Sequence, residues 1–309
     1  MFLIFYSGKM SCDLWERIAM SKYEHKADLS KIEVCKNLTG FLRSIQFALA
    51  SGYRYYVTGQ ISYDKIVSVM NKFDEMYRIC ESAMDRTRRH KLDQAVVTIK
   101  VFFPVNGSKE NDVFHYILLA KPGINKSKRS MDHIFFYREK YSDAHNKKQA
   151  ITIEHYVFTR INKEAYEAIL PSGKQIKSAT QEGVWTCTLS EKYIKNMRDG
   201  FNATLLNRDW FAAHRIMCSQ TKLIPFHGVR HDYLSLRKYF YKTYNEFIKT
   251  SNDPVIRSKK PKEIYQMLEK LMVMKGITIF KIKLSELLNN KILKKTTIRK
   301  SRQQQDNNQ

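Results

Sequence analysis

The chain has 309 residues, with 54 Lys and Arg against 30 Asp and Glu, which leaves a formal net charge of +24 at pH 7. Hydrophobic residues make up 43% and aromatic residues 12%, more than a mainly disordered chain carries, and the 11 Gly and 6 Pro exclude a collagen-like or linker-like composition. A folded protein with this positive excess is expected to have a polyanion as its partner.

The N-terminal part of the chain begins with a predicted helix and strand. From Ile32 to Leu49, apolar residues recur every three or four positions, which predicts an amphipathic helix that Gly52 ends. The aromatic and β-branched run Tyr53–Thr58 predicts a strand. Ser62 then caps a second predicted helix.

Two further strands are predicted as a hairpin. They cover Ala95–Phe103 and Val113–Ala120, and Asn106-Gly107 between them is a turn signal. With the preceding strand and helix they give the order β-α-β-β, the start of a ferredoxin-like unit. The sequence therefore predicts an α+β fold with a mixed or antiparallel sheet and packed helices.

The second half of the chain changes from strands to helices. A polar stretch with one short element near His133–Tyr137 precedes strands at Ala150–Thr159 and Val184–Leu189, and the pattern is helical from Ser190 to Lys249. We therefore expect a sheet domain over 1–189, a helical region over 190–250, a basic C-terminal arm over 251–302 and a disordered tail over 303–309.

Positive charge is concentrated near the C-terminus. Residues 255–302 contain 14 Lys and Arg against three acidic residues, and a basic turn lies earlier in the chain. Cations at this density suit phosphate neutralisation, although a solvated surface would have the same composition. The residues expected to contact phosphates are Arg86, Arg88, Arg89, Lys259, Lys260, Lys262, Lys294, Lys295, Arg299, Lys300 and Arg302.

Aromatic residues on the predicted strands offer a second binding element. Tyr53 and Tyr55 share one face of their predicted strand, where exposed rings could stack unpaired bases. Tyrosine is also an ordinary strand former, and half of such residues must face the core. The sequence favours the core interpretation and keeps stacking as the alternative.

One short motif resembles a catalytic site. His227, Arg230 and His231 have the HxxRH spacing of the second active-site box of tyrosine recombinases, and Tyr265 follows where a nucleophile could lie. In such enzymes Arg and His stabilise the charge on the transferred phosphoryl group. The same residues can simply begin a helix that packs on the core, and the sequence favours this alternative because no upstream arginine box is found.

Metal and cofactor sites are not predicted. His227 and His231 have the spacing of a helical zinc pair, but Gly228 stands where a zinc protease needs glutamate. The five cysteines are scattered and none forms a CxxC pair. With neither a signal peptide nor an apolar run of about 18 residues, we expect a cytoplasmic protein without a membrane span.

Three segments resemble a group of proteins from mobile elements. The runs Gly52–Gly59, His115–Gly123 and Val184–Thr186 look like parts of poorly characterised proteins carried by bacterial plasmids and integrating conjugative elements. The resemblance spans about residues 50 to 250 and implies a mobile-element context, without catalytic residues to carry over.

The sequence as a whole favours a non-enzymatic nucleic-acid-binding protein, for DNA rather than RNA, that acts in replication, maintenance or transfer of a mobile element. One alternative is a DNA strand-transfer or nicking enzyme with a tyrosine nucleophile. The other is an RNA-binding protein.

Overall fold

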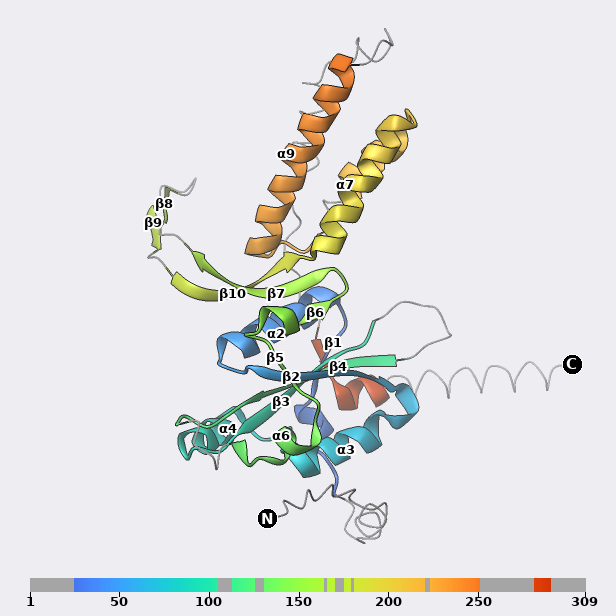
Figure 1. Cartoon of the computed structure of the whole chain (residues 1–309). Helices are drawn as coiled ribbons and strands as arrows, with labels where there is room; N and C mark the ends of the chain where they lie inside the picture. Colours follow the sequence, from blue (N-terminus) through green and yellow to red (C-terminus); the bar gives the residue numbers. More distant parts are fainter. Residues whose placement is uncertain are drawn as a thin grey trace, which may run out of the picture.

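The structure is a computed structural model that describes residues 25–104, 113–125, 131–163, 166–169, 175–178, 181–219, 223–250 and 281–289. A six-stranded mixed sheet lies in the lower half of the view in Figure 1, and a three-stranded sheet and a helical layer lie above it. The predicted α+β class is confirmed.

The large sheet is built mainly from the first part of the chain. Its strand order is β11-β1-β3-β4-β2-β5, with β1 and β3 parallel and the remaining neighbours antiparallel. The elements from this part are η1 (Leu29–Lys31), β1 (Glu33–Cys35), α2 (Leu38–Ala50), β2 (Tyr55–Ser62), η2 (Tyr63–Lys65), α3 (Ile66–Tyr77), α4 (Ala83–Lys91), β3 (Val96–Phe102) and β4 (Val113–Lys121).

Strand β4 lies between β2 and β3, so the chain forms the split β-α-β arrangement that starts a ferredoxin-like unit. The hairpin of β3 and β4 is confirmed, with Val96 opposite Lys121 and Phe102 opposite His115. The turn signal Asn106-Gly107 lies outside the described residues.

The helix predicted from Ile32 is wrong at its start. Glu33–Cys35 form strand β1, and the helix begins only at Leu38. Asn37 has an extended backbone and its side chain accepts a hydrogen bond from the Gly40 N–H at 3.0 Å, so it is the helix N-cap. The helical spacing of Ile32 and Cys35 is therefore coincidental.

The middle of the chain adds the second sheet, whose order is β10-β7-β6. The predicted strand Ala150–Thr159 is divided into two strands by a turn in which Glu154 has a φ of 55°. The predicted short element near residue 133 is confirmed as helix α6. The elements are α6 (Ile134–Arg138), β5 (Ser142–Asp143), η3 (Lys147–Gln149), β6 (Thr152–Ile153), β7 (Tyr156–Lys163), β8 (Tyr166–Ile169), β9 (Gln175–Ser178) and β10 (Gln181–Leu189).

Between residues 190 and 250, the described part of the chain forms three helices after β10, as predicted from residue 190 onward. They are α7 (Glu191–Leu206), α8 (Trp210–Ser219) and α9 (His227–Thr250), and α7 and α9 run side by side away from the two sheets (Figure 1). Ser190 caps α7 by accepting a hydrogen bond from the Tyr193 N–H at 3.3 Å. The buried residues of α9 recur at helical spacing, including Val229, Leu236 and Phe240.

Two hydrophobic cores lie on opposite faces of the large sheet. Strand β3 sends Val97, Ile99 and Val101 into the core shared with α3 and α6, and Val96 into the core shared with α2, β7, β10 and the three helices. Helix α2 is thus enclosed between the two sheets, and the helices after residue 190 share its core.

Part of the predicted basic arm belongs to the large sheet. Strand β11 (Lys281–Lys283) pairs antiparallel with β1, and residues 284–289 continue as a helical turn whose Leu284 and Leu287 are buried with α3. The other residues of the arm and the tail at 303–309 lie outside the described residues.

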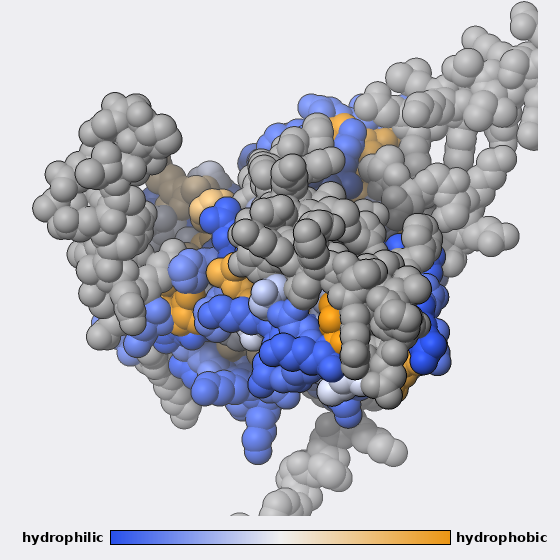
Figure 2. Space-filling view, turned by 90° about the horizontal axis from the view of Figure 1, so that it is seen from above, coloured by the Kyte–Doolittle hydropathy of each residue, from blue (hydrophilic) through white to orange (hydrophobic). Residues whose placement is uncertain are grey.

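The described residues that are visible from above are mainly hydrophilic (Figure 2). In the view from above, the coloured hydrophobic areas are small and separated by hydrophilic residues (Figure 2). In the part of the chain that the structure describes, no helix combines the length and the apolar character that crossing a membrane requires.

The start of α9 depends on a close contact that only glycine allows. A Cβ at Gly228 would lie 2.5 Å from the Cys187 carbonyl oxygen, whereas a Cβ at Gly200 of α7 would meet Ile216 at 3.6 Å, an ordinary contact. We expect Gly228→Ala to lower the free energy of unfolding by about 1–3 kcal/mol. Urea unfolding of both variants tests this, since Gly200→Ala should be neutral or stabilising by up to about 1 kcal/mol. Equal stability of the two variants would contradict the packing described.

Candidate nucleic-acid interface

Two adjoining hollows lie where α2, α4 and β3 meet, with volumes of about 250 and 270 Å³. Both are lined by Ser44, Arg86, Thr98 and Lys100, so they form one continuous depression, which we call the basic trough. Among its described lining residues, six are basic and one is acidic: Lys31, Arg86, Lys100, Lys121, Lys281, Lys283 and Glu33.

Lys100 reaches the trough because of strand alternation. Its neighbours Ile99 and Val101 face the α3 core, so Lys100 and Thr98 point to the other side of the sheet, toward α2. Strand β1 pairs only with the last two residues of β3, Val101 and Phe102. The preceding part of β3 borders α4. Lys100 is consequently half-buried at the centre of the trough.

Strand β11 supplies two cations at one end of the trough. In its register with β1, Lys283 lies opposite Glu33, and the alternating Ile282 packs into the α3 core. Lys281 Nζ donates to Glu33 Oε2 at 2.7 Å, and Lys283 Nζ lies 4.0 Å from Oε1. The hydrogen bond from Lys281 lowers the pKa of Glu33.

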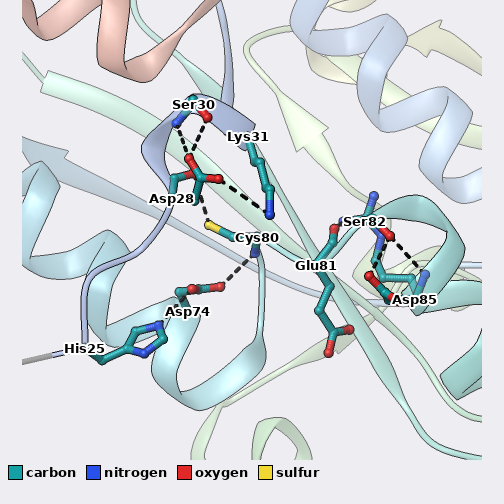
Figure 3. Close-up of polar contacts among 10 residues, drawn as sticks. His25, Asp28, Ser30, Lys31, Asp74, Cys80, Glu81, Ser82 and Asp85 are labelled. Carbon is teal, nitrogen blue, oxygen red and sulfur yellow. Dashed lines mark hydrogen bonds and ion pairs between the residues drawn. The ribbon is translucent and has the colours of Figure 1, made fainter. Parts of the chain in front are cut away.

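Capping hydrogen bonds hold the turn that carries Lys31 (Figure 3). Asp28 accepts a hydrogen bond from the Ser30 N–H at 3.2 Å and pairs with Lys31 Nζ at 3.5 Å. The preceding residues are fixed to α3, since a ring nitrogen of His25 lies 2.8 Å from an Asp74 carboxylate oxygen. Asp74 also accepts the Cys80 N–H at 2.8 Å, so one carboxylate ties the chain on both sides of α3.

The wall formed by α4 is held in a similar way. Ser82 is its N-cap and accepts the Asp85 N–H at 3.1 Å (Figure 3). One turn further, Arg86 lines both hollows and donates from Nη1 to the Glu81 carbonyl oxygen at 2.9 Å. At the other end, Lys121 Nζ donates to the Ser51 carbonyl oxygen at 3.2 Å.

The electrostatics of the trough favour an anion. The pKa of Lys100 is lowered, first by burial and then by the positive charges of Arg86 and Lys281. The pKa of Lys121 is lowered by burial and by Arg86. Burial and the neighbouring cations both disfavour the protonated form of these two lysines, and a bound phosphate would favour it.

The three predicted arginines of α4 have different surroundings. Arg86 lines the trough, and Arg88 is exposed. Arg89 turns inward, where its guanidinium donates to Glu81 Oε2 at 3.0 Å and to the Ala95 carbonyl oxygen at 3.1 Å. Arg89 therefore stabilises the junction of α4 and β3, and its N–H groups donate to acceptors within the protein.

The two predicted stacking tyrosines pack in different cores. Tyr53 is 7% exposed and belongs to the α2 core, with Lys121 Nζ 5.3 Å from its ring centroid. Tyr55 packs with the α3 core, edge-to-face against Phe136 at 5.3 Å and Tyr141 at 5.2 Å. The prediction that the two tyrosines share one face of a strand is wrong, because Tyr53 precedes β2 and only Tyr55 belongs to that strand.

The structure brings three of the four recombinase-like residues together. His227, Arg230 and His231 are exposed on the first turn of α9. Tyr265 lies outside the described residues, as do the predicted phosphate contacts of the arm. These are Lys259, Lys260, Lys262, Lys294, Lys295, Arg299, Lys300 and Arg302.

Among the described residues there is no group of three or more His, Cys, Asp or Glu that could hold a metal ion.

Sequence reasoning missed the central residues of the trough, although signals for them exist. Lys100 interrupts the apolar run of β3, where a charged residue must face something other than core. Phe47 lies off the buried face of α2 and is 65% exposed at the rim of the trough. Lys281 and Lys283 alternate around Ile282, which faces the core, and this is a strand pattern inside the predicted basic arm.

Comparison of the chain with family models, curated proteins and solved structures finds no match. The geometry of the trough is therefore the basis on which a function can be assigned.

Replacing the central lysine should stabilise the unliganded protein. Because the pKa of Lys100 is lower in the folded chain than its ordinary value of 10.5, its protonated form costs folding free energy below the folded pKa. This cost disappears as the pH rises to the unfolded value. We expect Lys100→Met to raise the Tm near neutral pH at low salt, and the gain to shrink as the pH approaches 10.5. Thermal unfolding across this pH range measures it, and a lower Tm near neutral pH would contradict the electrostatic description.

Proposed function

We propose that the protein binds nucleic acid through phosphate contacts in the basic trough. The observation that carries the proposal is the convergence of six cations with one carboxylate on a single depression, with a half-buried lysine at its centre. Bringing these like charges together costs electrostatic free energy when no anion is bound, and a phosphate backbone would supply the negative charge that offsets it.

The charge of the whole chain supports the same partner. A net charge of +24 attracts polyanions over distances longer than one contact, and cations placed at phosphates release condensed counterions. DNA as the target, and a role in replication, maintenance or transfer of a mobile element, remain predictions from the sequence.

Fluorescence anisotropy with a labelled oligonucleotide across a salt series tests the proposal. The test variant is the double substitution Lys100→Met with Lys283→Gln, which removes two trough cations. The matched control is Lys65→Gln with Lys192→Gln, which removes two exposed lysines from η2 and α7.

Wild type and control should bind with a steep salt dependence. The trough variant should bind more weakly at every salt concentration, and its slope of log K against log salt should be smaller by about 0.7–0.9 for each phosphate that is no longer neutralised. Absence of binding by the wild type at physiological salt would falsify the proposal. Equal weakening in both double variants would show that binding follows net charge and does not involve the trough.

A further inference from the structure

An exposed aromatic ring lies at the rim of the basic trough. Phe47 projects from α2 with 65% of its surface exposed and lines the same hollow as Arg86, Lys100 and Lys121. The adjacent residue Ala48 is 6% exposed and belongs to the core. Because Phe47 lines this hollow, its ring lies on the side of α2 that borders the trough.

Phenylalanines elsewhere in α2 and in the β3–β4 hairpin are used for packing. Phe41 of α2 stacks on Phe102 at a centroid distance of 5.5 Å, and Phe103 and Phe114 lie 4.6 Å apart. A single exposed apolar residue is ordinary on a protein surface and needs no explanation by itself. What distinguishes Phe47 is its place among converging cations, since the combination of an exposed ring and a cationic groove is typical of proteins that bind single strands.

The geometry of the trough also discriminates between forms of nucleic acid. Lys100 is half-buried in a hollow bordered by α2 and α4, so a phosphate must enter the hollow to approach it. In a duplex, base pairing fixes the distance between backbones, and stacking hides the base faces. A single strand can bend a phosphate inward and turn an unpaired base onto an aromatic ring.

We infer that the basic trough binds single-stranded nucleic acid, with Phe47 stacking on an unpaired base while Arg86, Lys100 and Lys121 contact neighbouring phosphates. This inference rests on the proposed function and adds the form of nucleic acid and the residue that selects it.

The experiment compares Phe47→Ala with Leu206→Ala, since Leu206 is an exposed apolar residue on α7 with 77% of its surface accessible. Binding is measured by anisotropy with a labelled single strand and with the duplex of the same sequence. The wild type should prefer the single strand, and Phe47→Ala should weaken single-strand binding about fivefold or more, because stacking on one ring contributes that much or more. Duplex binding should change little in either variant.

A second variant reports the contact directly. Phe47→Trp should keep the affinity for the single strand, and its fluorescence should be quenched on binding beyond the change seen with wild type. A third variant, Ala83→Glu, places a carboxylate at the trough on the first residue of α4, where an acidic residue favours the helix. It should weaken single-strand binding with no loss of Tm.

The outcomes separate this inference from the proposed function. If single strand and duplex bind equally and Phe47→Ala binds like Leu206→Ala, the inference is overturned while phosphate binding stands. If neither nucleic acid binds, both fail. Loss of binding in Phe47→Ala together with an unquenched, tightly binding Phe47→Trp would also overturn stacking.

Discussion

The burial of helix α2 between two sheets is the constraint on which the remaining structure depends. Leu42, Ile45 and Leu49 are almost completely buried, and the same core contains residues of β3 and β4 on one side and of β7 and β10 on the other. Gln46 Nε2 also donates to the Trp185 carbonyl oxygen at 2.6 Å, which fixes α2 to β10 by a directional contact. A helix enclosed in this way cannot shift without opening both sheets.

The position of α2 also creates the trough. A single helix is narrower than the face of a six-stranded sheet, so part of that face, including Thr98 and Lys100, is bordered by α2 without being filled by it. Helix α4 and the turn with Lys31 border the remaining sides. The depression is therefore bordered by packed elements of the fold, which lowers the entropic cost of holding a ligand.

Most of the fold could be predicted from the sequence, but little of the candidate site could. Periodicity identified α3, the β3–β4 hairpin and the three helices after residue 190, because each has a long one-sided apolar pattern. The three-residue strand β1 is too short to show such a pattern, so the sequence analysis assigned its residues to the helix that follows. Lys100, Phe47 and Lys281 come together only through sheet register and helix packing. Charge density alone points mostly to arm residues outside the described part of the chain, and to the α4 arginines, of which Arg86 lines the trough and Arg89 turns inward.

The trough joins segments from both ends of the described chain, and this has a consequence for binding. Glu33 and Lys281 are 248 positions apart, and their ion pair lies beside the pairing of β1 with β11. With Arg86, Lys100 and Lys283 nearby, the docking of β11 brings like charges together, and one carboxylate offsets only part of the repulsion. A phosphate bound among them would reduce the repulsion that opposes docking. Linkage then requires that whatever stabilises β11 on β1 also increases affinity for the phosphate, so β11 would be a structural part of the proposed phosphate-binding surface.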